Sequence, residues 1–280
     1  MKTLRYVVCD VFTDRPLAGN QLAVFTDAGS LGAETMQALA REMGFSESVF
    51  LCRPEQGGHA KLRIFTPTRE VPFAGHPVLG TAFVVAGPIT TEQVRLETGM
   101  GTVLVQLTRE GGRVVFGWMQ QPLPTVKAFE RSEELLAALG VTHATSPIET
   151  YDNGIAHTYV ELASREQVAA LEPDFAKLAK LPTLGVSAFA GTGFEYKTRM
   201  FAPAGGVNED PATGSAAGPL ALHLARHGRT LFGDEIRIEQ GAELGRPSVL
   251  FARATGHKER VETVEVGGSA VIVARGEFRI

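Results

Sequence analysis

The chain has 280 residues, of which 44% are hydrophobic and 21% charged, and its formal net charge is −4. This balance is ordinary for a well-packed globular protein of one large or two medium domains. A slightly acidic chain without a Lys/Arg run is not expected to bind nucleic acid or an anionic membrane. No apolar stretch approaches the ~20 residues of a membrane span. Two cysteines, Cys9 and Cys52, indicate a reducing compartment, so we expect a cytoplasmic protein.

Short strands are predicted along most of the chain, where apolar and β-branched runs alternate with turn residues. Gly111-Gly112 lies between two such runs and predicts a β-hairpin. The predicted strands are 6–12, 22–25, 48–52, 60–65, 103–107, 113–116, 235–238, 248–251, 261–266 and 270–274.

Capping signals predict three amphipathic helices. Ser30 can cap a helix that ends before Gly44, and a second helix runs from Ser132 to Leu139. Ser164 and Gln167 match a capping box that opens the third.

Two further helices, beginning near His76 and near Ser215, are apolar on almost every side, so each is predicted to be buried. Strands around one buried helix in each half predict an α+β fold of two similar lobes. We assign 1–122 to the first lobe, joined by the last strand at 270–280, and 123–269 to the second. The active site is expected in the cleft between them.

The segments that lead into the two buried helices share a short pattern of acid, proline and glycine. The aligned pairs are Glu70 with Glu209, Pro72 with Pro211, Gly75 with Gly214, and His76 with Ser215. The match is short, and either a true repeat or chance would produce it. A true repeat would present two helix N-termini, whose N–H groups and dipoles can bind a carboxylate and stabilise an enolate.

Further motifs follow one another from end to end of the chain. They are Asp10-Val11-Phe12-Thr13, Gly19-Asn20, Gly44-Phe45-Ser46-Glu47-Ser48, Arg63-Ile64-Phe65-Thr66-Pro67, Glu70 to Pro77, Glu209 to Pro219, and Gln240-Gly241. With these motifs the chain resembles the phenazine-biosynthesis PhzF-like isomerase family. The resemblance implies a fold like that of diaminopimelate epimerase, a homodimer, and catalysis without cofactor or metal. It also implies a small amino-acid-like carboxylate as substrate.

The family's reference reaction moves a proton on trans-2,3-dihydro-3-hydroxyanthranilate to give its ketone tautomer. The resemblance makes Glu47 the acid/base and gives His76 and Asp210 catalytic roles. It assigns the remaining substrate contacts to Asn20, Ser46, Gly75, Gly214 and Ser215. Gln21 departs from the proline that the family commonly has after this asparagine, which affects the expected shape of the pocket rim.

Several alternatives stay open or are disfavoured. An isomerase or epimerase of the same family acting on another cyclic or α-amino acid is the nearest one, and a non-catalytic ligand-binding protein on this fold is the other. A two-thiol epimerase is disfavoured because Ala74 and Pro211 stand where its thiols would lie. His223 and His227 have zinc-ligand spacing without the Glu of His-Glu-x-x-His, so no metal is expected.

Overall fold

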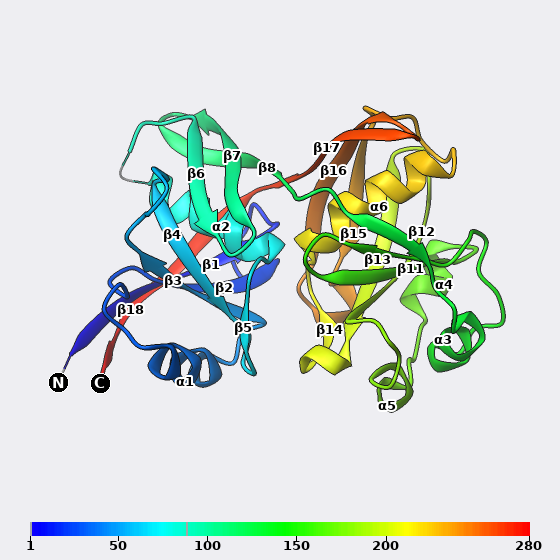
Figure 1. The fold of residues 1–280 in the computed structure, drawn as a ribbon, viewed down its shortest axis with the longest axis horizontal. Coiled ribbons are helices and arrows are strands. Elements are labelled where there is room, and N and C mark those ends of the chain that lie inside the picture. The colour runs from blue at the N-terminus through cyan, green and yellow to red at the C-terminus, as the bar shows by residue number, and fades with distance from the viewer. Residues whose placement is uncertain (1, 88) are drawn as a thin grey trace. The chain divides into compact units, whose positions relative to one another are not determined.

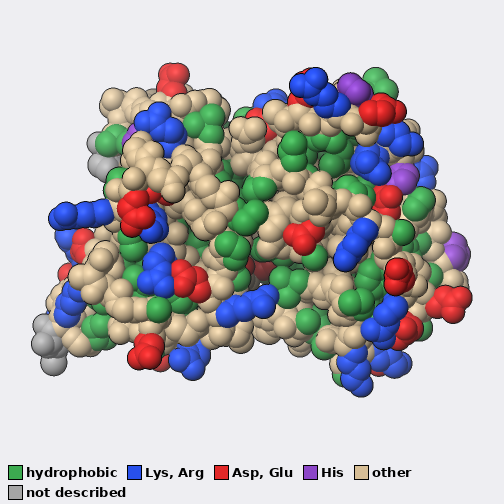
Figure 2. Space-filling model, in the orientation of Figure 1, with side chains coloured by type: hydrophobic (Ala, Val, Ile, Leu, Met, Phe, Trp, Pro, Cys, Tyr) green, Lys and Arg blue, Asp and Glu red, His purple; other side chains and the backbone are tan. Residues whose placement is uncertain are grey.

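The computed structural model describes residues 2–87 and 89–280, and these form two compact units (Figure 1). The first unit comprises 1–120 and 267–280, and the second comprises 121–266. Among the described residues, no helix is long and apolar enough to cross a membrane. Basic and acidic side chains are interspersed over the face in view in Figure 2.

Strands of the first unit form a continuous hydrogen-bonded series. Its order is β18, β1, β2, β3, β4, β6, β7, β8, and β5 pairs with β4. The β2–β3 and β4–β6 pairs are parallel, and the other pairs are antiparallel. The elements are β1 (Thr3–Val11), β2 (Asn20–Phe25), α1 (Ala33–Met43), β3 (Glu47–Cys52), β4 (Ala60–Phe65), β5 (Glu70–Val71), α2 (Gly75–Ala86), β6 (Gln93–Thr98), β7 (Gly101–Glu110), β8 (Arg113–Gln120) and β18 (Ala270–Arg279).

Helix α2 is the buried centre of the first unit. All but two of its twelve residues are buried, and it contacts β1 to β4, β6 to β8 and β18. At Gly80 an added Cβ would lie 2.6 Å from a methyl of Val11 and 2.8 Å from one of Leu22. The helix therefore lies close against β1 and β2 only because this position is glycine.

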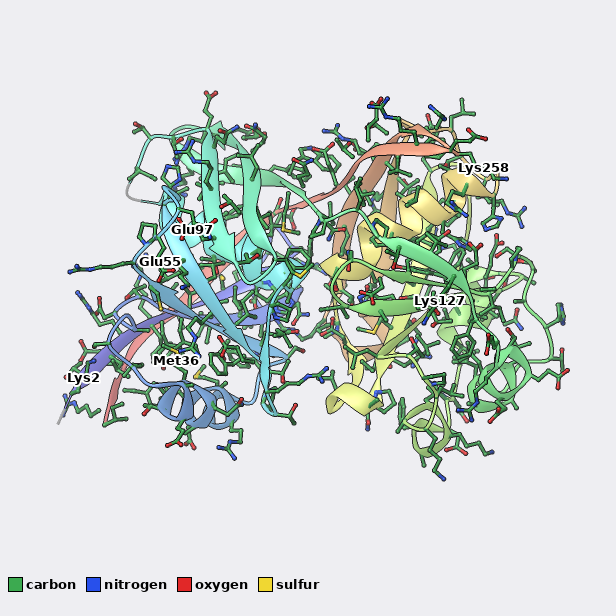
Figure 3. The ribbon with its side chains drawn as sticks, viewed as in Figure 1. Lys2, Met36, Glu55, Glu97, Lys127 and Lys258 are labelled. Atoms are coloured by element: carbon green, nitrogen blue, oxygen red, sulfur yellow. The ribbon has the colours of Figure 1, made fainter. Side chains whose placement is uncertain are left out.

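A buried carboxylate holds the loop between β3 and β4. Glu97, on β6, accepts the backbone N–H groups of Glu55, Gln56 and Gly58 at 2.6, 2.6 and 2.9 Å (Figure 3). Three backbone donors compensate the cost of burying this charge and order the loop.

The second unit has the same style of construction. Its elements are β9 (Thr125–Ala128), α3 (Ser132–Leu139), β10 (Glu149–Asp152), β11 (Ala156–Glu161), α4 (Arg165–Ala169), α5 (Phe175–Leu178), β12 (Gly185–Thr192), β13 (Glu195–Ala202), the 3₁₀ turn Pro203–Gly205, β14 (Val207–Asp210), α6 (Gly214–Arg226), β15 (Glu235–Gln240), the 3₁₀ turn Ala242–Leu244, β16 (Ser248–His257) and β17 (Arg260–Gly268), whose last two residues belong to the first unit. Helix α6 has eleven of its thirteen residues buried. The expected α+β class, with strands around a buried helix in each unit, is confirmed.

Pairing within each unit follows one topology. In the first, β2–β3 is parallel, β3–β4 antiparallel, β4–β6 parallel and β6–β7 antiparallel. In the second, β11–β12, β12–β13, β13–β15 and β15–β16 repeat that series. A short strand, β5 or β14, pairs antiparallel just before the buried helix in each case.

The register makes this similarity residue-specific. Ser48 pairs with Phe65 as Val186 pairs with Phe201, and Ile64 pairs with Val71 as Met200 pairs with Asp210. The acids of the sequence pattern also match. Arg63 binds Glu70 through two hydrogen bonds of 2.7 and 2.6 Å, and Arg199 binds Glu209 through two of 2.8 Å. Shared topology, register and ion pair favour a true repeat over chance.

Most local predictions hold, with one correction. Gly111 and Gly112 form the β7–β8 hairpin, both with positive φ. Ser164 caps α4 by accepting the N–H of Gln167 at 3.2 Å. The Ser30 cap is wrong, because α1 begins at Ala33 with Gly32 as its N-cap, and the Ser30 hydroxyl instead accepts from Lys2.

Candidate functional site

Three predicted site residues meet in the first unit. Asn20 begins β2 and Glu47 begins β3, and these parallel neighbours start at the same edge, with Leu22 opposite Glu47. His76 is the second residue of α2. Nδ2 of Asn20 lies 3.2 Å from Nδ1 of His76, and Nε2 of His76 lies 3.6 Å from Oε2 of Glu47. The strand starts and the helix start thus bring an amide, an imidazole and a carboxyl together.

His76 is held in its neutral form. Its side chain is buried, and this burial lowers its pKa to about 3, although the backbone carbonyl of Gln21 acts in the opposite direction. When Nδ1 accepts from the Asn20 amide, the ring proton lies on Nε2, on the side of Glu47. The Glu47 side chain keeps 17% exposure, so a substrate can reach its carboxyl beside the buried ring.

The other two predictions in this unit are chain neighbours of these residues. Ser46 directly precedes Glu47, in the bend between α1 and β3, and Gly75 is the first residue of α2. The N-cap residue Ala74 makes no side-chain cap, so the first-turn N–H groups lack the usual side-chain acceptor. Such a helix start is suited to an anionic ligand.

In the second unit, Asp210 lies in a tightly bonded loop. Its carboxylate accepts the Thr213 hydroxyl at 2.6 Å, and its carbonyl accepts Nε2 of Gln240 at 2.7 Å. The same Gln240 Nε2 lies 3.0 Å from the Thr213 hydroxyl, and Gln240 Oε1 accepts the Thr213 N–H at 3.2 Å. The sequence prediction missed this function of Gln240, although Gln240-Gly241 belongs to the motifs that carry the resemblance.

Ser215 has a partner that the sequence did not indicate. Its hydroxyl lies 3.0 Å from Nε2 of His157, a residue of β11 that is 2% exposed. Burial lowers the pKa of His157 to about 4, so this ring is also neutral at pH 7. The ring occupies the space over Gly185, where a Cβ would lie 2.7 Å from Nδ1. A single histidine in a strand gives no sequence signal for such a contact.

Side chains from outside the helix bind the carbonyls of the first turn of α6. Pro219 has no N–H, so the carbonyl of Ser215, four residues earlier, lacks its helical donor. Asn153 supplies one instead, and two further side chains donate to the neighbouring carbonyls. The bonds are Gln121 to Gly214 at 2.8 Å, Asn153 to Ser215 at 3.0 Å, and Tyr159 to Ala216 at 2.6 Å. The start of α6 is thereby held in a fixed position within its unit.

Comparison with known proteins identifies the family. Residues 9–276 match the family model PhzC-PhzF, described as phenazine biosynthesis-like protein. The chain is 53% identical to a trans-2,3-dihydro-3-hydroxyanthranilate isomerase of Pseudomonas aeruginosa, over 97% of this chain and 98% of that protein. It is 49% identical to the Pseudomonas fluorescens enzyme of that name, with the same coverage. A phenazine biosynthesis protein of the PhzF family from Bacillus anthracis superposes with a TM-score of 0.87 at 25% identity, over 100% of both chains. The chain therefore belongs to the PhzC-PhzF family of phenazine biosynthesis-like proteins.

Proposed function

We propose that this protein is a cofactor-independent isomerase that converts trans-2,3-dihydro-3-hydroxyanthranilate into its ketone tautomer in phenazine biosynthesis. Two relatives of about half-identical sequence and matching length bear the name of that isomerase. The observation that carries the proposal is the partly exposed Glu47 carboxyl beside the neutral ring of His76. Carbon-acid chemistry needs such a base, held close to the substrate and largely shielded from water.

In the proposed reaction, Glu47 removes the proton from C3 of the ring and a proton is returned to C1, after which the enol becomes the ketone. One proton leaves and one arrives, so no oxidant, reductant or leaving group is needed. A single carboxyl suffices because it holds the abstracted proton until C1 takes it. Neutral His76, oriented by Asn20, would donate a hydrogen bond without competing as a strong base.

We further propose that residues of both units act on one substrate molecule. Asp210 would bind the ring amine or hydroxyl, and its bonds to Thr213 and Gln240 would keep the carboxylate oriented. The helix starts at Gly75 and Gly214, with Ser46 and the Ser215 hydroxyl, would bind the substrate carboxylate. The backbone N–H groups of the helix starts would also stabilise the negative charge that develops as C3 loses its proton.

Racemisation by two thiols is the less favoured chemistry. Ala74 and Pro211 occupy the loop positions before the two buried helices. The two cysteines lie elsewhere, Cys9 within β1 and Cys52 at the end of β3. Burial raises the pKa of the Cys9 thiol to about 12, so it is a poor source of thiolate at neutral pH.

The test is proton NMR in deuterated water with trans-2,3-dihydro-3-hydroxyanthranilate, comparing the wild type with Glu47→Gln. We expect the wild type to consume the diene with deuterium entering the ring, and Glu47→Gln to be slower by about 10²–10⁴-fold. Glu42→Gln, an exposed residue of α1, is the matched control and should keep wild-type turnover. Near-wild-type turnover by folded Glu47→Gln would remove Glu47 from the mechanism. A folded but inactive wild type would instead indicate another amino-acid substrate within the family.

We also propose, from the family resemblance, that the protein works as a homodimer in the cytoplasm. Its two cysteines are both free thiols, which suits a reducing compartment. Sedimentation velocity across a dilution series tests the oligomeric state, and a monomer at all concentrations would contradict the dimer.

A further inference from the structure

A cluster of metal-binding side chains lies in the second unit, apart from the residues assigned to the reaction. It consists of Glu149 on β10, His223 in the last turn of α6, and His227 at the C-cap of that helix. Their candidate ligand atoms all lie within 4.8 Å of one another. We propose that these three residues bind a divalent transition metal ion, with Zn²⁺ as the best match. This inference does not depend on the proposed function.

The spacing of the ligand atoms suits such an ion. Nε2 of His227 lies 2.9 Å from Oε2 of Glu149, and Nδ1 of His223 lies 3.4 Å from the same oxygen. Zinc binds imidazole nitrogen and carboxylate oxygen at about 2.0–2.2 Å, which separates neighbouring ligand atoms of a tetrahedral site by about 3.3–3.6 Å. The His223–Glu149 distance falls in this range, and the shorter His227–Glu149 contact must open for an ion to enter between the two residues.

His223 provides a second, independent observation. It is 1% exposed, and its Nδ1 lies 3.4 Å from Oε2 of Glu149, an ion-pair contact that lacks the geometry of a well-formed hydrogen bond. The ring packs against those of Tyr151, Tyr159 and Phe189, with centroids 5.6, 5.7 and 5.6 Å away. A buried nitrogen that is held in place without a hydrogen bond is costly, and a metal ion would use its lone pair.

The surroundings provide support for the ligands and a route of entry. The Tyr151 hydroxyl donates to Oε2 of Glu149 at 2.8 Å and so orients the carboxylate, as outer-shell partners do in metal sites. His227 keeps 23% exposure, which lets an ion enter and leaves room for solvent as a fourth ligand. Bound metal would tie the C-terminal end of α6 to β10. The sequence did not predict this metal site, because its carboxylate comes from β10 and not from the helix that carries both histidines.

The test is calorimetric titration of chelator-treated full-length protein with Zn²⁺, together with thermal unfolding. We expect one Zn²⁺ per chain and a higher unfolding midpoint, because an ion that binds only the folded state stabilises it. His227→Gln should weaken binding by at least about 100-fold, and Tyr151→Phe by about 10-fold, while isomerase turnover stays unchanged in His227→Gln.

The matched control is His257→Gln, which removes the histidine of an exposed His257–Glu259 pair. This variant should bind Zn²⁺ like the wild type. Equal zinc affinity in the wild type and His227→Gln, or no measurable binding to a folded wild type, would overturn the proposal. Co²⁺ titration gives an independent readout, because visible absorption bands should appear in the wild type and disappear in His227→Gln.

Discussion

The two units share one strand pairing around a buried helix, but their acidic side chains lie at different positions of this arrangement. The register of the repeat aligns Glu47 with Gly185, because each is the first paired residue of its strand, β3 or β12. It also aligns Asp210 with Val71, since each pairs with the equivalent residue of the preceding strand. Each unit has thus an acid where the other has glycine or valine.

This difference suggests a division of labour between two similar helix starts. At α2, the carboxyl of Glu47 stands beside a neutral imidazole, an arrangement suited to moving a proton. At α6, His157 fills the space over Gly185 and contacts Ser215, while outside side chains bind the first-turn carbonyls. That arrangement is suited to holding a ligand in one orientation. One frame can therefore serve two functions after changes at a few positions.

The largest expected effect is a kinetic difference between substitutions at the start of α2 and at the start of α6. His76→Asn should lower kcat by about 10²-fold, because it removes the group next to the proposed acid/base. Ser215→Ala, at the aligned position, should chiefly raise KM, by about 10-fold or more, because it removes the hydrogen bond proposed between this hydroxyl and a charged substrate. Steady-state kinetics of both variants, with circular dichroism to verify folding, provides the check. If both variants change kcat and KM in the same proportion, the division of labour is wrong.

The next largest effect is on stability at acidic pH. The folded-state pKa values of His76 and His157, about 3 and about 4, lie below the unfolded value near 6.5. Between these values the unfolded chain binds the extra protons, so stability is full above about pH 6.5 and falls as the pH drops towards 4. Each histidine should contribute a slope of about 1.4 kcal/mol per pH unit.

Urea unfolding from pH 7 to pH 4.5 measures this slope. His76→Asn and His157→Asn should each make it shallower, one variant for each unit. His143→Asn, at an exposed position, is the control and should leave the slope unchanged. A wild-type slope that neither substitution reduces would show that the two buried rings do not resist protonation as their burial implies.

A smaller effect is expected from placing a side chain at Gly185, the position of the second unit that aligns with Glu47. In Gly185→Ala the new Cβ would lie 2.7 Å from Nδ1 of His157 and 3.2 Å from Sδ of Met200. The ring must shift, which disturbs its contact with Ser215, and we expect a loss of about 1–3 kcal/mol in unfolding free energy.

Gly32→Ala is the matched control, because its Cβ would meet nothing within 4 Å, and it should change stability by less than about 1 kcal/mol. The KM of Gly185→Ala should also rise, as in Ser215→Ala. Wild-type stability and KM in Gly185→Ala would show that His157 does not depend on this glycine.

The sequence predicts the parts of the fold that depend on local chemistry. The Gly111-Gly112 hairpin, the Ser164 cap and the burial of α2 and α6 all follow from short-range patterns and are confirmed. Strands β12 and β13 are not among the predicted strands. Gly191-Thr192-Gly193 forms the end of β12 and the turn into β13.

For the site, the motifs supplied individual residues but not their supporting contacts. The family resemblance singled out Glu47, His76 and Asp210, because those residues lie within the segments that carry it. His157, Asn153 and the side-chain contacts of Gln240 could not be found in this way. Each such contact joins segments distant in sequence, and only the strand register brings them together.

The smallest effect concerns the proline that distinguishes the two buried helices. Pro77 lies in the first turn of α2, where no helical carbonyl depends on its missing N–H. Pro219 lies inside α6, where its missing N–H leaves the carbonyl of Ser215 without a helical donor. Asn153→Ala should therefore cost about 1–3 kcal/mol, since it leaves the buried Ser215 carbonyl without a donor. Pro219→Ala supplies a backbone N–H to that carbonyl, so in its background Asn153→Ala should cost less, with a coupling of about 1 kcal/mol in a double-mutant cycle.

Pro77→Ala is the control background and should leave the cost of Asn153→Ala unchanged. Additivity within about 0.5 kcal/mol for the Pro219 cycle would mean that Asn153 stabilises the second unit independently of the proline.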